Sequence, residues 1–145
     1  MNLEKYSVVT DDEHLTYEFL SQGSKGTIKK IVFYQEIEDN VFNLAFGDWD
    51  EASQKINDKV RSNNDDRNKV LATVASTVID FIKYHPDASI FAQGNTPGRT
   101  RLYQMGILTS WHEISKLFDI QGNFKGTWEA FEENKNYQAF LLNAK

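Results

Sequence analysis

The chain has 145 residues, a formal net charge of −5 and an aromatic content of 13%, with three Trp and ten Phe. These values predict one packed domain over residues 1–145 and exclude a disordered chain. The absence of cysteine excludes disulfides, thiolate metal sites and a thiol nucleophile, and the acidic balance argues against a protein that coats duplex nucleic acid.

Four strands are predicted in the first third of the chain because β-branched and aromatic residues recur between short polar turns. They span Leu3 to Thr10, Leu15 to Leu20, Thr27 to Glu38 and Val41 to Phe46. The short connections favour an antiparallel meander. The pattern breaks from Gly47 to Asp50, and a short amphipathic helix is predicted from Glu51 to Arg61.

The clearest helix runs from Asn68 to Tyr84, where apolar residues recur at three- and four-residue steps. Asp65 or Asp66 is a suitable N-cap and brings a carboxylate to the positive first turn. The helix should end at His85 because a residue that precedes proline is pushed out of the helical region. Its flanks are apolar as well, so we predict a core helix that is covered on more than one side.

After the central helix, a strand is predicted from Ser89 to Gln93 and a helix that begins at Thr96-Pro97 and ends at Gly106. Ser110 and Glu113 have the spacing of a capping box, which predicts another helix to Phe118. The segment YQAFLL reads as a last strand. The fold class is therefore α+β: a curved, mainly antiparallel sheet of four N-terminal strands plus later strands, packed on a central apolar helix, with a second helical segment.

The stretch GNTPGRTRLY, residues 94–103, has the strongest functional signal. Arg99 and Arg101 lie in the first turns of a helix, where the helix dipole disfavours cations. Free N–H groups, two guanidiniums and two hydroxyls at a helix start favour binding of phosphate or carboxylate. The predicted anion site comprises Thr96, Gly98, Arg99, Thr100 and Arg101. The alternative is that the arginines pair with an acidic residue such as Asp48, Asp50 or Glu51, and both interpretations stay open.

Two further groups of residues could carry chemistry. His112 and Tyr103 are candidates for acid/base roles beside the arginines. Lys25, Lys29 and Lys30, with Phe33 and Tyr34 nearby, could line a path for single-stranded nucleic acid, or they could protect an exposed strand. The acidic residues around Trp49 lack the spacing of a calcium loop, so no metal and no cofactor is predicted.

The segments GNTPGRTRLYQMGI, IQGNF and YQAFL resemble a family of small uncharacterised bacterial proteins, known as a domain of unknown function and commonest in Bacteroidetes. The resemblance covers nearly the whole chain and implies no activity, so it assigns no catalytic residue. The order of strands and helices is also loosely similar to Whirly-like single-strand-binding folds. That resemblance implies a nucleic-acid partner only by analogy of fold.

Three functions follow from these patterns. The first is a non-enzymatic binding module for a phosphate-bearing partner, including single-stranded nucleic acid. The second is a small, toxin-like hydrolase or nuclease that uses Arg99, Arg101, Tyr103 and His112. The third is a scaffold or homo-oligomer. No apolar run reaches the roughly 18 residues of a membrane span, and the charged N-terminus lacks a signal-peptide core, so a cytoplasmic location is predicted.

Overall fold

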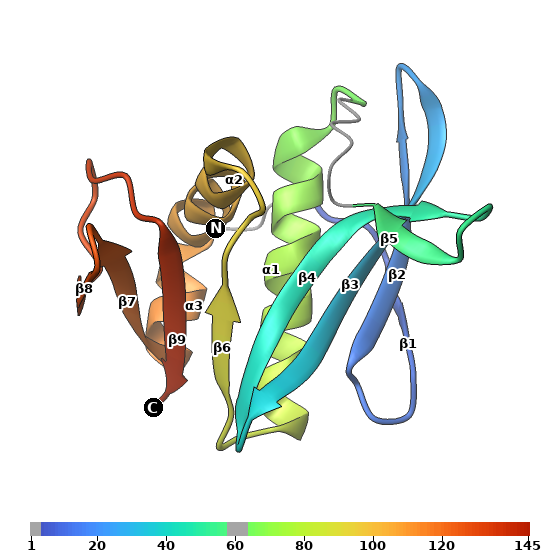
Figure 1. The fold of residues 1–145 in the computed structure, drawn as a ribbon. Helices are drawn as coiled ribbons and strands as arrows, with labels where there is room; N and C mark the ends of the chain where they lie inside the picture. The colour runs from blue at the N-terminus through green and yellow to red at the C-terminus, as the bar shows by residue number, and fades with distance from the viewer. Residues whose placement is uncertain (1–3, 58–63) are drawn as a thin grey trace.

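One curved sheet and three helices make up the part of the chain that the computed structural model describes, residues 4–57 and 64–145 (Figure 1). The helices are α1 (Arg67–Tyr84), α2 (Pro97–Thr109) and α3 (Trp111–Leu117). The strands are β1 (Val9–Thr10), β2 (Thr16–Gly23), β3 (Gly26–Glu38), β4 (Val41–Asp50), β5 (Lys55–Asn57), β6 (Ser89–Ala92), β7 (Phe118–Phe124), β8 (Thr127–Ala130) and β9 (Ala139–Ala144).

The sheet has the order β1-β2-β3-β4-β6-β9-β7-β8, and β5 pairs with β4. Every strand pairing is antiparallel except that of β4 with β6. In Figure 1 the three helices lie on one side of the sheet, with α1 behind β3 and β4. The α+β class and the mainly antiparallel, curved sheet are therefore confirmed. None of the helices in the described residues has the length and apolar content that a membrane crossing requires.

The central helix forms the core as predicted. Phe81 is fully buried, and its ring stacks on Tyr34 of β3 at 4.3 Å and meets Phe42 of β4 edge-on at 5.1 Å. Aromatic pairs of this geometry contribute beyond their buried area. Asp66 occupies the N-cap position but makes no side-chain cap. Instead its carboxylate accepts hydrogen bonds from the hydroxyls of Tyr6 and Ser21, and α1 has no acidic residue in its first turn.

Two predictions in the first half of the chain are wrong. The strand expected from Leu3 to Thr10 is reduced to Val9–Thr10 among the described residues. The expected break at Gly47 to Asp50 is absent, because β4 continues to Asp50. Asp48 lies opposite Lys30 of β3, and the two side chains form an ion pair at 2.6 Å. A neighbouring strand therefore stabilises an extended conformation that the polar sequence disfavours.

The helix expected from Glu51 to Arg61 is also wrong over its described part. A turn at positions 51–54 reverses the chain, and β5 returns along β4. The Asp50 carboxylate accepts the backbone N–H of Ala52, and Gln54 adopts a left-handed φ of 55°. These are features of a tight turn rather than of a helix start. Residues 58–61 of the expected helix, and positions 61–63 of the loop expected after it, lie outside the described residues.

In the second half, Gly106 does not end α2 but lies inside it. A Cβ at this position would meet the Leu71 side chain of α1 at an ordinary 3.6 Å, so the glycine is a point of close helix contact. Ser110 occupies the cap between α2 and α3, yet its side chain makes no cap hydrogen bond, so the expected capping box is not formed. The last strand is confirmed as β9, which lies between β6 and β7.

Candidate functional site

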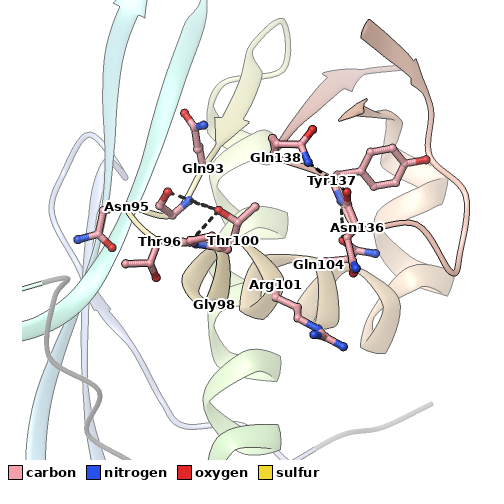
Figure 2. Close-up of a pocket in the computed structure, with 12 residues that line it drawn as sticks. Gln93, Asn95, Thr96, Gly98, Thr100, Arg101, Gln104, Asn136, Tyr137 and Gln138 are labelled. Atoms are coloured by element: carbon pink, nitrogen blue, oxygen red, sulfur yellow. Dashed lines mark hydrogen bonds between the residues drawn. The ribbon is translucent and has the colours of Figure 1, made fainter. Parts of the chain in front are cut away.

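A pocket of about 470 Å³ opens where β6 and β9 diverge, beyond their last pair, Ala92 and Phe140. Its walls come from three segments: the end of β6 with its loop, the first turns of α2, and the connection that leads from β8 to β9 (Figure 2). Four of the five residues predicted for an anion site line it, namely Thr96, Gly98, Thr100 and Arg101. A pocket of this size suits a small-molecule ligand rather than a lone ion.

The start of α2 is built as the sequence predicts. Thr96 is extended at the N-cap, and its side chain accepts the backbone N–H of Arg99 at 3.2 Å, with Pro97 at the first helical position. The buried Thr100 hydroxyl accepts the backbone N–H of Gly94 at 3.0 Å. Both hydroxyls therefore hold the loop in place.

Arg99 has a structural partner. Its Nη2 donates to the Phe46 carbonyl oxygen at 2.6 Å, and its guanidinium lies 5.7 Å from the centre of the Phe46 ring. Phe46 lies between the last β4 residue that pairs with β6, Leu44, and the first that pairs with β5, Asp48. A carbonyl in that gap has no strand to donate to it, and Arg99 satisfies it. This arginine does not line the pocket.

Arg101 lies on the same helix but differs from Arg99 in every respect that matters for binding. It is exposed, it lines the pocket, and no ion pair or hydrogen bond joins it to the described residues. Its side chain extends along α2 at the pocket rim in Figure 2. Neither arginine forms the alternative pairing with Asp48, Asp50 or Glu51 within the described chain. Asp48 instead forms an ion pair with Lys30. Arg101 is therefore available to a ligand.

Amide side chains line the pocket on α2 and on the segments that face it. Gln104 is buried; its Nε2 donates to the Lys135 carbonyl and its Oε1 accepts the backbone N–H of Tyr137. Gln138 accepts the backbone N–H of Lys125 at 2.7 Å. Gln104 therefore fixes the connection between β8 and β9 against α2, and Gln138 fixes it against the turn between β7 and β8. Gln93 and Asn136 are exposed, and their amides have no recorded partner in the described chain.

A charged network stiffens the same connection. The Tyr137 hydroxyl donates to Glu129 at 3.0 Å and accepts the backbone N–H of Glu132. Burial raises the pKa of Tyr137. Lys135 bonds Glu129 at 2.7 Å, which lowers the pKa of Glu129 and raises that of Lys135. The pocket wall at residues 136–138 is therefore held by Gln104 of α2 on one side and by the Glu129 network on the other.

The candidate acid/base residues are not brought together. Tyr103 packs against the hydrophobic core, and His112 is exposed on α3. Neither lines the pocket, and Arg99 is bound to Phe46. No group of three or more His, Cys, Asp or Glu residues in the described chain could hold a metal ion. The geometry therefore does not assemble the residues expected for a hydrolase or nuclease.

The lysine cluster is also divided. Lys30 is buried and paired with Asp48, whereas Lys29 points to the other face of the sheet and pairs with Glu18 at 3.2 Å. We expect Lys30→Ala to destabilise the protein by about 1–3 kcal/mol because the half-buried Asp48 loses its partner. Lys29→Ala is the matched control, with an expected loss of about 0.5 kcal/mol, since its pair is exposed. Urea unfolding measures both; equal effects would contradict this assignment.

Sequence reasoning missed part of the pocket. Gln93 and Gln104 directly flank the predicted stretch 94–103, whereas residues 136–138 lie far along the chain. Only the pairing of β6 with β9 and the docking of α2 bring residues 136–138 to this stretch, so no local signal could have found them.

Comparison with known proteins gives one match. A family model described as "Family of unknown function (DUF6934)" matches residues 2–145. No curated protein and no solved structure matches the chain.

Proposed function

We propose, for a chain that belongs to the DUF6934 family of unknown function, a non-enzymatic role in binding a small ligand that carries phosphate or carboxylate. The observation that carries this proposal is a pocket whose lining includes three exposed polar side chains from separate segments. Gln93, Arg101 and Asn136 come from β6, α2 and the connection to β9, and none has a recorded partner in the described chain. Ligand pockets typically place a few such groups in a concave site.

Charge supports an anionic ligand. Within the part of the chain that the structure describes, Arg101 is the one formally charged side chain that lines the pocket. It lies in the first turns of α2, where the helix dipole adds positive potential and where an anion is favoured. The chain as a whole is acidic, so attraction must act locally rather than through the net charge. An Arg guanidinium binds phosphate and carboxylate through two parallel hydrogen bonds.

Binding is favoured over catalysis because the pocket lacks a reactive group. Among the described residues, its lining holds no histidine, carboxylate or lysine. The Thr100 hydroxyl is buried and bonded to the backbone, and no base lies beside it. Nucleophilic or acid/base chemistry needs a pair of such groups in contact. A strand of nucleic acid along the sheet is the weaker candidate, since Lys30 is buried in an ion pair.

Thermal denaturation with and without phosphate tests this proposal, with chloride at matched ionic strength as the control. A ligand at about 100 times its Kd stabilises a protein by about 2.7 kcal/mol, so the melting temperature should rise. Citrate serves as a carboxylate probe. A melting temperature that responds to ionic strength but not to either anion would contradict an anion site.

A further inference from the structure

We infer that the ligand is a nucleoside monophosphate, whose base is recognised by the amides of Gln93 and Asn136 and whose phosphate is held by Arg101. This inference rests on the proposed function and names its ligand class. The pocket volume of about 470 Å³ is larger than an anion alone needs and lies within the range of small-molecule sites. Part of the ligand must therefore contact the wall away from Arg101.

The lining contains amides with two different roles. Gln104 of α2 donates to the Lys135 carbonyl and Gln138 accepts the backbone N–H of Lys125 in the turn between β7 and β8, so both are structural. Gln93 and Asn136 keep both amide groups accessible, and they lie on separate segments of the rim (Figure 2). A side-chain amide presents one donor and one acceptor next to each other. The edges of nucleobases present the complementary arrangement, which is how Asn and Gln recognise bases in nucleic acids.

Charge balance limits the ligand further. Over residues 4–57 and 64–145 the pocket lining has one cation and no carboxylate, so it suits a neutral group joined to a single anionic group. The guanidinium of Arg101 extends along α2 rather than over the pocket (Figure 2). An exposed side chain changes rotamer within nanoseconds, so it can turn toward a bound phosphate without movement of the backbone. A nucleoside monophosphate combines the neutral edge and the anion in one molecule.

Calorimetric titration of the full chain with 5′-mononucleotides of the four bases tests this inference, with ribose 5-phosphate as the probe that lacks a base. We expect at least one mononucleotide to bind about tenfold more tightly than ribose 5-phosphate, the gain expected from one or two added hydrogen bonds. Gln93→Ala with Asn136→Ala should reduce nucleotide affinity to that of ribose 5-phosphate and leave ribose 5-phosphate unaffected. Gln35→Ala, an exposed amide on β3, is the matched control.

Two results would overturn the inference and are distinguishable. If ribose 5-phosphate binds as tightly as every mononucleotide, the base is not recognised, and the anion site of the proposed function stands. If neither nucleotides nor inorganic phosphate bind, the proposed function fails as well. A 5′-phosphorylated tetranucleotide presents the same chemistry at a strand end. Tighter binding of the tetranucleotide would identify a strand end as the source, and equal or weaker binding would identify the free nucleotide.

Discussion

Replacement of Val74 by Asp should leave no folded protein. Val74 lies at the middle of α1, is buried at 8% exposure, and belongs to the hydrophobic core shared by the helix and the sheet. A carboxylate there has no cationic partner, and its desolvation costs several kcal/mol, which is comparable to the whole stability of a domain of this size. Circular dichroism and gel filtration of the purified variant measure the outcome.

Asn68→Asp is the matched control for this variant. Asn68 is exposed in the first turn of α1, where a carboxylate interacts favourably with the helix dipole. The control should fold with unchanged or slightly higher stability, which separates the effect of burial from the effect of an added charge. A Val74→Asp protein that is soluble and melts cooperatively at the parent temperature would show that this face of α1 is not core.

Gly94→Ala should destabilise the protein by about 3 kcal/mol or more. A Cβ at position 94 would lie 2.4 Å from both the Arg99 Cβ and the Thr100 backbone nitrogen. Since helix backbone rather than a flexible side chain must move, relief of the clash shifts the first turn of α2 and deforms the pocket. We therefore expect both a lower melting temperature and a loss of phosphate binding.

Gly106→Ala, in the same helix, should have the opposite sign. Its Cβ would meet Leu71 at 3.6 Å, and Ala favours a helix by about 0.5–1 kcal/mol over Gly. Urea unfolding of both variants gives the two free energies on one scale. Equal destabilisation by Gly94→Ala and Gly106→Ala would contradict the close approach of the β6 loop to α2.

Local signals in the sequence predicted the elements whose stability is local. The apolar repeat of α1 and the Thr96-Pro97 start of α2 depend on residues within one or two turns, and both are present. The meander of β2, β3 and β4 followed from short turns, one of which uses Asn40 at a left-handed φ of 59°. Such positions are favourable for Asn and need no distant partner.

Predictions that depended on distant partners were wrong. Asp48 resembles a turn residue in the sequence, yet Lys30 on the adjacent strand keeps it within β4. Asp66 occupies the N-cap position as predicted, but the expected side-chain cap is not formed, because its carboxylate accepts hydrogen bonds from the Tyr6 and Ser21 hydroxyls. In each case an interaction with a side chain far along the chain outweighs the local conformational preference.

For the candidate site, the sequence identified α2 but treated Arg99 and Arg101 as one pair. The structure separates them, because the β4 edge between β6 and β5 leaves the Phe46 carbonyl open to Arg99. Arg101 is left at the pocket. This division depends on where β5 and β6 pair along β4, which no motif in residues 94–103 encodes.

The most direct test of the account is therefore a comparison of Arg99→Ala with Arg101→Ala by thermal denaturation, each with and without phosphate. Arg99→Ala should lower stability by about 1–3 kcal/mol, because the Phe46 carbonyl loses its donor, and should retain a phosphate-dependent rise in melting temperature. Arg101→Ala should melt at the parent temperature and show no such rise. The reverse pattern, with Arg101→Ala destabilised and still stabilised by phosphate, would contradict the anion site.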